Sequence, residues 1–420
     1  MWVYSADHAI HELLLQSEHR TFDPEEADFF YVPQYSNCMM FPLHGWADFP
    51  WFAPPGMGLR VPHAVFLMLQ AKAWIAEHHP YWNRTQGRDH IWLTTHDEGA
   101  CWAPNEIINS IFLTHWGRLE LNHTSNTAFA SDNYNLDEKS KRLPDGWTHL
   151  IKGHACYDPD KDLVVPSFKS PQHYGRSSLV GRSPELRHHL LFFRGDVGKK
   201  REARYSRGVR QRLYNLWKSE GWQKKYNVTV AGNDDGVDGP YSEWLSRSKY
   251  CLVVPGDGWS ARAEDAILHG CVPVVIMDGV HQSFQSVLDW PSFSVQIPEA
   301  DAERIVDILL AIPERKLRSL QAHLSRVWHR FRYVAGPALA NLYTRDLTRN
   351  LAAHDGEREL QAAVRARLVS EGGAAGRELP RLPRPFRGDP TVDDAFSTIM
   401  QWLHSRVGTR GAQAGRTPSA

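Results

Sequence analysis

A Gly-Asp-Gly loop and the polar turn after it form the part of this sequence best suited to chemistry. Residues 249–254 (KYCLVV) are predicted to form a buried strand, Gly256 and Gly258 follow it, and Ser260 begins the next predicted helix. Ligands bind at the carboxyl ends of parallel strands, and the free N–H groups of a helix N-terminus attract anions. With Ser260 as the N-cap, the loop is expected to bind a phosphate or diphosphate.

Two charged residues in the first turn of that helix strengthen the expectation. Arg262 is a cation near a helix N-terminus, which costs about 0.3–1 kcal/mol unless an anion compensates it. Asp265 lies three residues on, where it could accept hydrogen bonds from ribose hydroxyls. The alternative is a solvated i,i+3 ion pair between the two. The glycines alone are a weak signal, because the loop lacks the full GxGxxG pattern of dinucleotide-binding proteins.

A basic stretch lies close to this segment in the expected fold. Residues 194–212 contain eight basic and two acidic side chains and begin as the predicted strand 189–193 ends at Gly195. This stretch could form a second wall for the diphosphate or for an anionic glycan. The other interpretation is a solvated helix face. Within it we select Arg194, Gly195 and Arg210 as donor-binding candidates.

Two alternating series of strands and helices position these residues. In the first series, strands are predicted at 27–32, 90–95 and 162–165, with a helix at 63–77 and a linker at 166–184. In the second, strands are predicted at 189–193, 228–231, 249–254, 271–277 and about 293–296, and helices at 206–219, 241–248, 260–269, 302–311 and 314–330. Such alternation implies parallel sheets covered on both faces. We therefore expect two doubly wound α/β domains, 1–175 and 185–345, that face one another across a cleft.

The C-terminal part has a different pattern. Residues 346–407 are expected to contain helices and an extended connector, because 371–389 is rich in Gly, Pro and Arg. A helix is predicted at 393–406, and it carries an apolar stripe that must be buried, formed by Phe396, Ile399, Met400 and Leu403. The tail, 408–420, is expected to be disordered.

Composition excludes several classes of protein. The 420 residues suffice for two or three domains, and 48 basic side chains balance 48 acidic ones, so no global field attracts nucleic acid or an anionic membrane. The longest apolar runs fall far short of the roughly 18–20 residues that span a bilayer, and the first ten residues do not form a signal peptide. Five cysteines without CxxC spacing allow one or two disulfides and argue against a zinc knuckle.

The sequence resembles the exostosin family of glycosyltransferases, glycosyltransferase family 47. The family pattern CLVPxG, SxRxxDAIxxGCxPVII and PFxxxxDW is met by residues 251–256, 260–276 and 283–290, and upstream signatures are met at 20–33, 87–92 and 190–195. The resemblance covers roughly residues 10–345. Two positions depart from the pattern: Glu264 replaces an apolar residue, and Ser283 stands where the family often has proline.

This resemblance implies a GT-B fold, in which the N-terminal Rossmann-like domain binds the acceptor and the C-terminal one binds a UDP-sugar. It assigns donor binding to Ser260, Arg262 and Asp265 and implies inverting transfer to a polysaccharide or glycoprotein glycan without a catalytic metal. A C-terminal helix would return to the first domain. Partners would be the UDP-sugar donor, the glycan acceptor and a homo- or hetero-oligomer. The implied setting is the Golgi lumen, which three sequons permit, and the chain would be a soluble portion or a shortened sequence of an anchored enzyme.

The first domain offers two candidates for the base that such a transfer requires. His96 and Asp97 follow the strand at 90–95, and an inverting transferase needs a base that takes the proton of the acceptor hydroxyl. The ordinary pKa of histidine, about 6.5, suits a near-neutral lumen better than that of aspartate, about 3.9, unless burial raises the latter. Because side chains alternate along a strand, only one of the two is expected to reach the cleft.

We favour Asp97 as the base, because short carboxylates serve in many inverting transferases, and His96 is the alternative. Asp97 could instead orient the imidazole, or cap the next turn beside a histidine of the core. A metal site formed with His115 lacks HxH or HExxH spacing, so no metal is expected.

Two other functional classes fit parts of the sequence. A catalytically silent partner subunit would keep the fold within a glycosyltransferase complex, but Arg262 and Asp265 are intact. A nucleotide-sugar epimerase or dehydrogenase would need GxGxxG and a tyrosine–lysine pair at helical spacing, which the sequence lacks.

Overall fold

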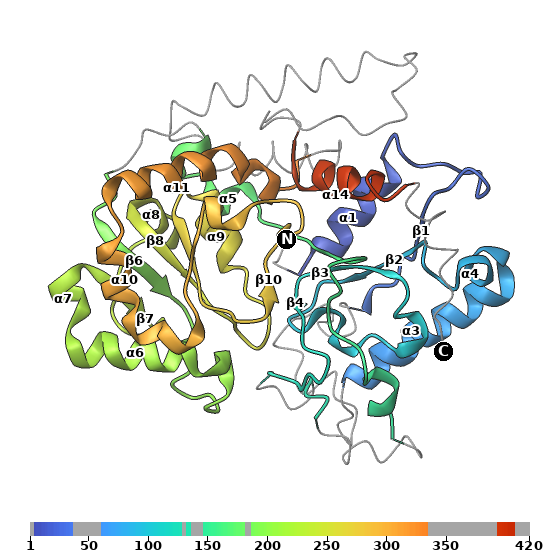
Figure 1. The fold of residues 1–420 in the computed structure, drawn as a ribbon, viewed down its shortest axis with the longest axis horizontal. Coiled ribbons are helices and arrows are strands. Elements are labelled where there is room, and N and C mark those ends of the chain that lie inside the picture. The colour runs from blue at the N-terminus through green and yellow to red at the C-terminus, as the bar shows by residue number, and fades with distance from the viewer. Residues whose placement is uncertain are drawn as a thin grey trace.

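The computed structural model shows an α/β protein with two parallel sheets and a short two-stranded ribbon. It describes residues 4–36, 60–127, 132–135, 146–180, 186–334 and 393–407. We call the described residues up to 180 the first half and 186–334 the second half. The two halves lie side by side, with the second half on the left in Figure 1. The expected boundaries at 345 and 346, the connector and the tail 408–420 fall outside the described residues.

The first half is built on four parallel strands in the order β1-β2-β3-β5. These are β1 (Phe30–Tyr31), β2 (His90–Thr94), β3 (Ile111–Thr114) and β5 (Leu163–Val164). The strands predicted at 27–32, 90–95 and 162–165 are confirmed, although all three are shorter than predicted. β3 was not predicted, because a four-residue apolar run gives too little periodicity to assign.

Helices cover both faces of this sheet. Trp92 and Phe112 share an apolar cluster with α3 (Arg60–His78), which is followed by α4 (Pro80–Thr85). Their neighbours Ile91 and Leu93 face the opposite way, toward α1 (Ala6–Leu15). This division follows from the alternation of side chains along a strand. The helix predicted at 63–77 is therefore confirmed as α3.

The second half has five parallel strands in the order β11-β9-β8-β6-β7. They are β6 (His189–Arg194), β7 (Val228–Ala231), β8 (Ser248–Val253), β9 (Val272–Val275) and β11 (Val295–Gln296). Counted along the chain the order is 2-1-3-4-5, which is a doubly wound sheet with its switch point between β6 and β8. The predicted strands are confirmed.

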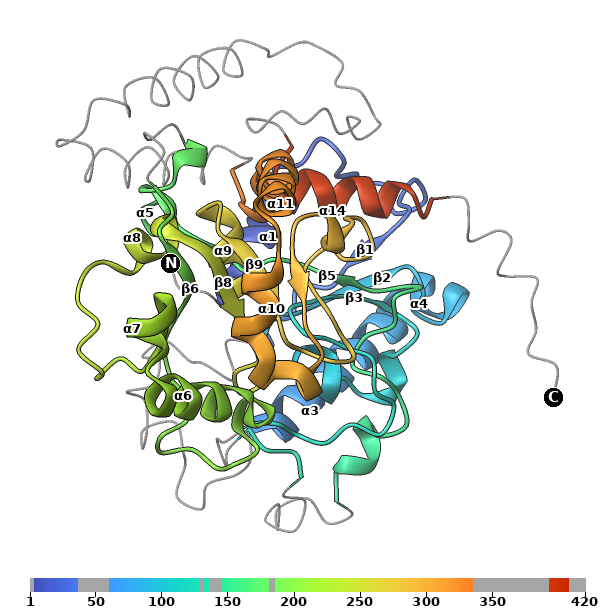
Figure 2. The ribbon, with the colours of Figure 1, turned by 60° about the vertical axis from the view of Figure 1, so that its left-hand side comes forward.

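The helices predicted for the second half are also present. They are α6 (Val209–Glu220), α8 (Tyr241–Arg247), α9 (Arg262–Leu268), α10 (Ile305–Ala311) and α11 (Glu314–Val327). The short helix α7 (Trp222–Tyr226) was not predicted. α6, α10 and α11 contribute apolar side chains to one core cluster with β6, β8 and β9. Figure 2 shows α11, α10 and α6 ranged along the outside of the sheet.

The two halves are joined directly. β4 (Gly117–Arg118) of the first half pairs with β10 (Val280–His281) of the second half in an antiparallel ribbon. Phe284 N–H donates to the Val164 carbonyl at 2.7 Å next to this ribbon. Neither short strand was predicted, because each has two residues and its partner lies in the other half.

Residues 166–184, predicted as an interdomain linker, do connect the two halves, but the first part of this segment is packed in the interior. Residues 166–171 are buried and include the start of α5 (Pro171–Tyr174). The cause is a buried lysine in this segment, Lys169, whose ammonium group pairs with a carboxylate of α9. The segment therefore packs against both halves.

The C-terminal helix α14 (Ala395–His404) packs on the first half. Phe396, Ile399 and Leu403 share one apolar cluster with Ile91 and Leu93 of β2. Asp394 caps the helix, since its side chain accepts a hydrogen bond from the Ser397 N–H at 2.8 Å. Figure 1 shows α14 beside α1. The apolar stripe predicted for 393–406 is thus buried where the C-terminal helix was expected to return.

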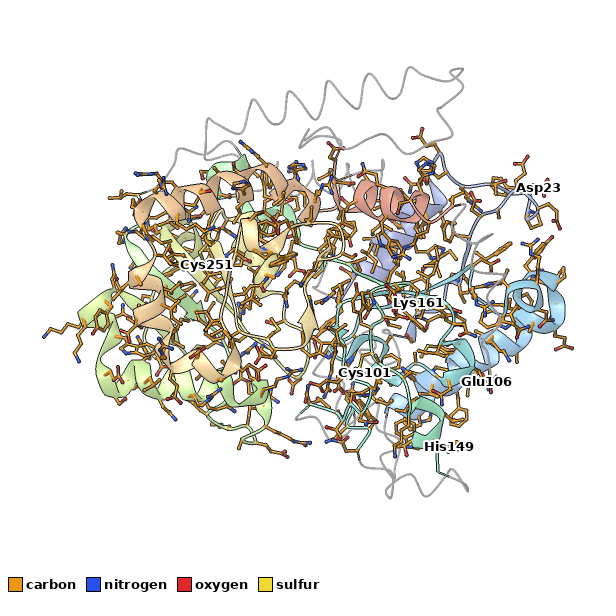
Figure 3. The ribbon with its side chains drawn as sticks, in the orientation of Figure 1. Asp23, Cys101, Glu106, His149, Lys161 and Cys251 are labelled. Carbon is orange, nitrogen blue, oxygen red and sulfur yellow. A yellow bond between two sulfur atoms is a disulfide. The ribbon has the colours of Figure 1, made fainter. Side chains whose placement is uncertain are left out.

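Two disulfides link cysteines that the sequence left unpaired. Cys101 is bonded to Cys156 in the first half, and Cys251 is bonded to Cys271 in the second. Figure 3 marks one cysteine of each pair. His123 is near the first pair, and within the described residues these three side chains are the group close enough to share a metal ion. Because the two cysteine sulfurs are bonded to one another, they do not serve as free thiolate ligands. None of the helices in the described ranges combines the length and the apolar character needed to cross a membrane.

Candidate functional site

Two arginines, Arg210 buried and Arg262 partly buried, meet at the switch point of the second sheet. The Cζ atom of Arg210 is 5.2 Å from the centre of the Phe193 ring, and the Cζ atom of Arg262 is 5.4 Å from the same centre. Phe193 is near the carboxyl end of β6, while the arginines come from α6 and from the first residue of α9. Because like charges this close repel one another, the pair creates a site that favours an anion.

Arg210 is held firmly in this place. It is 5% exposed, and burial lowers its pKa, although a guanidinium stays protonated. Its two terminal nitrogens reach four oxygens at 2.8–3.4 Å, which belong to Asp196, Tyr205, Val254 and Ser260. Of the two arginines selected from the basic stretch, Arg210 is therefore the one that lies beside Phe193.

Arg262 fits against the end of β6 because the strand ends in glycine. A Cβ atom at Gly195 would collide with Arg262 Nη2. The guanidinium donates to the Tyr241 hydroxyl, and its Cζ atom lies 5.1 Å from the centre of that ring. Arg262 also forms an ion pair with Asp265 at 3.7 Å. The side chains are only 24% and 9% exposed, so this pair is not the solvated alternative.

Asp265 has a stronger partner that the sequence did not reveal. Lys169 Nζ lies 2.6 Å from Asp265 Oδ1, and both side chains are buried. Burial pushes the pKa of Asp265 upward, but the charges of Lys169 and Arg262 outweigh it, and the pKa lies below its ordinary value. Asp265 therefore stays ionised at the site, where it can accept hydrogen bonds.

The loop after β8 differs from the prediction in one respect. Ser260 is not the N-cap of α9; the helix begins at Arg262 after Ala261, with no side-chain cap. The physical reason is that Ser260 Oγ is engaged by Arg210 at 3.4 Å. Ser260 still lies at the site, but as a partner of the cation.

The two glycines of this loop leave room for neighbouring atoms to come close to the backbone; neither has the positive φ that a glycine turn would require. A Cβ atom at Gly256 would lie 3.5 Å from Arg210 Nη2, so this glycine borders the arginine site. A Cβ atom at Gly258 would collide with the carbonyl oxygen of Asp97 in the first half. The absence of a side chain at Gly258 therefore lets the two halves come into close contact at this point.

Arg194 points to a different partner. Its Nη1 donates to the carbonyl oxygens of Val237 and Gly239 at 2.7 and 3.0 Å, so it holds the loop after β7. Most other cations of the stretch 194–212 pair with surface carboxylates, among them Lys199, Arg201, Arg204 and Arg207. The structure therefore brings Arg210 to Arg262 and leaves these cations on the surface.

Asp97 lies where the first half meets this loop. The main-chain N–H of Trp259 donates to the Asp97 carbonyl oxygen at 2.6 Å. The carboxylate accepts a hydrogen bond from the Tyr4 hydroxyl at 2.7 Å. Burial, together with the nearby charge of Asp257, raises the pKa of Asp97 to about 7, although Tyr4 and Arg210 act in the opposite direction. A carboxyl group with this pKa is matched to proton transfer near neutral pH.

His96 has the opposite character. It is 1% exposed, and burial lowers its pKa to about 3. The ring is 6.2 Å from Tyr4 and 5.9 Å from Trp102, measured between ring centres. This places it in an aromatic environment of the first half.

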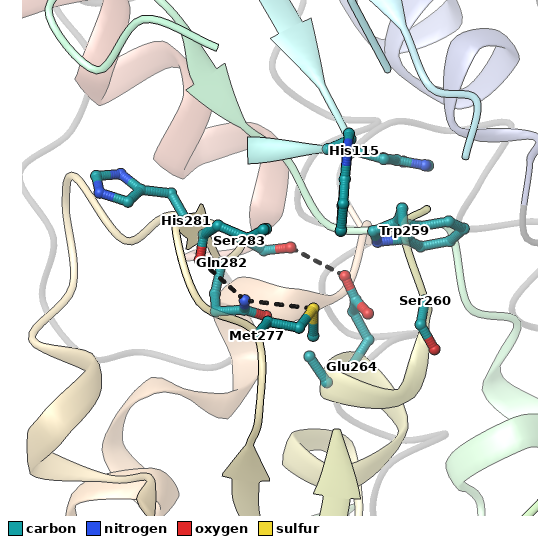
Figure 4. Close-up of a pocket in the computed structure, with 11 residues that line it drawn as sticks. His115, Trp259, Ser260, Glu264, Met277, His281, Gln282 and Ser283 are labelled. Atoms are coloured by element: carbon teal, nitrogen blue, oxygen red, sulfur yellow. Dashed lines mark hydrogen bonds between the residues drawn. The ribbon is translucent and has the colours of Figure 1, made fainter. Parts of the chain in front are cut away.

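A small pocket adjoins the arginine site on the side of β10. It has about 260 Å³ of empty space, part of it open to solvent, and its walls come from the end of β3, from α9 and from the segment after β9. Figure 4 shows the Glu264 carboxyl group between Ser283 and Trp259. Glu264 Oε1 accepts a hydrogen bond from Ser283 Oγ at 3.0 Å. The sequence gave no signal for this pocket beyond the two unusual residues at positions 264 and 283.

The sequence of residues 2–312 matches the Exostosin GT47 domain. The chain belongs to this family. The exostosin motifs noted in the sequence supply the end of β6, the loop after β8, α9 and β9, and with them Phe193 and Arg262; Arg210 comes from α6. Family membership and geometry therefore point to the same part of the molecule.

The exostosin relatives include named plant glycosyltransferases. The chain is 28% identical over 343 residues to the probable glucuronoxylan glucuronosyltransferase IRX7 of Arabidopsis thaliana, which covers 77% of this chain and 64% of the relative. It is 29% identical over 319 residues to the probable beta-1,4-xylosyltransferase IRX10L of the same plant, covering 74% and 65%. The probable glucuronosyltransferase GUT1 of Oryza sativa subsp. japonica is 29% identical over 333 residues, covering 77% and 68%. The chain thus spans about two-thirds of the length of such relatives, and a little less for IRX7.

Proposed function

We propose that this chain is a glycosyltransferase that moves a sugar from a UDP-sugar donor to a polysaccharide acceptor, with inversion at the anomeric carbon. The observation that carries the proposal is the pair of guanidinium groups of Arg210 and Arg262, whose Cζ atoms lie 5.2 and 5.4 Å from the centre of the Phe193 ring at the switch point. A diphosphate would compensate their mutual repulsion through charge-assisted hydrogen bonds. Asp265, ionised beside them, would accept hydrogen bonds from the ribose. The names of the plant relatives support a polysaccharide acceptor.

The proposed arrangement is of the GT-B type, with the donor on the second half and the acceptor on the first. Asp97 takes the proton of the acceptor hydroxyl as its oxygen forms a bond to the anomeric carbon. The bond between that carbon and the diphosphate breaks, and UDP leaves with the electron pair. Arg210 and Arg262 stabilise the charge that develops on the leaving group. We propose that these cations act without a catalytic metal.

The disulfides support a setting in the secretory pathway. Structural disulfides form and persist in oxidising compartments and are rare in reducing ones. Each half contains one such bond, Cys101–Cys156 in the first and Cys251–Cys271 in the second. We therefore propose that the protein works in a lumen such as that of the Golgi.

Titration of the purified chain with UDP by calorimetry tests the proposal, followed by transfer assays with a panel of UDP-sugars and xylan oligosaccharides. Saturable UDP binding and release of UDP that depends on the acceptor are expected. Failure to bind UDP would overturn the proposal. Binding of UDP without transfer to any acceptor would instead favour the silent partner subunit.

A further inference from the structure

A loop at the junction of the two halves exposes an asparagine that the proposed function does not use. Asn122 lies shortly after β4, outside any helix or strand, and it is exposed. It is followed by His123 and Thr124, which completes a sequon for N-glycosylation. None of the described residues forms a hydrogen bond with the side-chain amide of Asn122. This amide group is therefore available for modification.

The loop that carries Asn122 is held at both ends. Arg118 Nη1 donates to the Thr124 carbonyl oxygen at 2.7 Å, which closes the loop. The buried carboxylate of Glu98 accepts a hydrogen bond from Ser125 Oγ at 2.7 Å. The tip between these anchors, residues 119–122, is exposed along its whole length. The fold therefore presents the sequon at the surface.

Two apolar side chains lie next to the asparagine at this tip. Leu119 is 36% exposed and Leu121 is 64% exposed. A glycan is bulky and increases solubility. A glycan attached to Asn122 would shield these two leucines from neighbouring molecules, which gives the modification a physical role.

The sequon at Asn227 is built into the fold. Asn227 Nδ2 donates to the His188 carbonyl oxygen at 3.0 Å and so connects the residues that precede β7 and β6. Thr229, the hydroxyl residue of this sequon, is 1% exposed and donates to Gln223 Oε1 at 2.9 Å. A sugar on Nδ2 would replace one of its two hydrogens and crowd the contact with His188. The folded protein therefore disfavours a glycan at Asn227.

The sequon at Asn83 is also engaged, although this asparagine is exposed. Asn83 lies within α4, and its Nδ2 donates to the Ala76 carbonyl oxygen of α3 at 3.1 Å. Thr85 Oγ1 donates to Asp89 Oδ1 at 2.6 Å. Of the three sequons, the one at Asn122 is therefore the one in which both side chains are exposed and form no hydrogen bond with the described residues.

We propose that Asn122 is a site of N-glycosylation and that Asn83 and Asn227 stay unmodified. This inference uses the lumenal setting proposed above and goes beyond the transferase activity. Asn122 Nδ2 forms a bond to the anomeric carbon of an oligosaccharide carried on a lipid diphosphate, which the cell supplies. The bond between that carbon and the diphosphate breaks, the lipid diphosphate leaves with the electron pair, and Nδ2 gives up one proton.

Secretion of the full chain from mammalian cells, behind a cleavable leader, tests the assignment. Peptide-N-glycosidase should increase the gel mobility of the wild-type chain in a single step. Mass spectrometry of its peptides should then find the asparagine-to-aspartate conversion that this enzyme leaves only at Asn122. Asn122→Gln should abolish the mobility shift. Thr124→Ala should abolish it as well, whereas Thr124→Ser keeps the sequon and should retain the shift. Asn83→Gln is the matched control and should also retain it.

The outcomes separate this assignment from the proposed function. A secreted chain that has both disulfides but no glycan at Asn122 overturns the assignment and leaves the lumenal setting standing. A glycan at Asn83 or Asn227 of the folded chain overturns the exclusion of those sites. Titration of Asn122→Gln with UDP tests the donor site separately, and its affinity should equal that of the wild type. Because the mass spectrum is taken on the wild-type chain, it decides the question even if a variant fails to fold.

Discussion

Lys169 Nζ lies 2.6 Å from Asp265 Oδ1, so a lysine from the segment between the halves neutralises an acid at the start of α9. Both side chains are buried. The connection sets the position of Asp265 relative to Arg262, and it explains why the connecting segment packs instead of running through solvent.

Removal of the lysine should be more harmful than removal of both charges. Lys169→Met leaves the Asp265 carboxylate buried with only Arg262 nearby, and the loss of one partner of a buried pair costs up to about 3–5 kcal/mol. The double variant Lys169→Met with Asp265→Asn should recover part of this loss. Urea unfolding measures both free energies. Equal stability of the single and double variants would contradict the pairing.

Arg262 should contribute directly to donor affinity. A charge-assisted hydrogen bond is worth about 1.5–3 kcal/mol, so Arg262→Ala should weaken UDP binding about tenfold or more. Arg304→Ala changes an arginine whose side chain is 69% exposed and serves as the control. UDP titration by calorimetry, with circular dichroism to verify folding, measures the effect. An unchanged dissociation constant in Arg262→Ala would reject the assignment.

Asp97 should control the pH dependence of turnover. A base must be ionised, and the pKa of Asp97 is about 7, so the rate should rise as pH increases through 7 and then level off. Asp97→Asn should reduce turnover by about 10²–10⁴ while UDP binding is spared. Tyr4→Phe removes a hydrogen bond that lowers this pKa, so the inflection should move to higher pH.

If His96 is the base instead, the variants should give the opposite result. If Asp97→Asn keeps near wild-type turnover while His96→Ala is inactive, the base is His96. A pH profile that is unchanged in Tyr4→Phe would also count against Asp97.

Asp7 should make the protein less stable as pH rises. Burial raises its folded pKa to about 7, above its ordinary value of 3.8, so the folded state holds a proton that the unfolded state releases. The free energy of unfolding should fall between about pH 4 and pH 7 and then level off. Asp7→Asn keeps the acceptor for the Thr95 hydroxyl and removes this loss.

We therefore expect Asp7→Asn to match the wild type at pH 4 and to exceed it at pH 8 by up to a few kcal/mol. Melting temperatures at the two pH values measure the difference. Asp238→Asn, at an exposed position, should leave the pH dependence as it is. A wild-type slope in Asp7→Asn would show that other buried acids account for it.

The sequence predicted the second half better than the first. Its strands are long apolar runs separated by helices, and each of them was found close to its predicted bounds. β3, β4 and β10 escaped prediction because two to four residues carry no clear period, and β4 and β10 become strands only by pairing with each other.

The sequence predicted mainly those residues of the site that belong to a single motif. Arg262 and Asp265 share a helical turn, and Arg210 was selected because its basic stretch directly follows the predicted strand that meets Gly195. Lys169 was missed because its partner is 96 residues away. Ser260 was assigned as a cap because the sequence does not show the tertiary contact with Arg210 that uses its hydroxyl.

The position of α14 has a consequence for biosynthesis. The first half is translated first, but one face of β2 is covered by a helix that comes almost at the end of the chain. Until that helix leaves the ribosome, Ile91 and Leu93 lack part of their cover, and contacts of such long range form late. The first half therefore completes its folding only after the second half has been synthesised, and its apolar face is prone to aggregation until then.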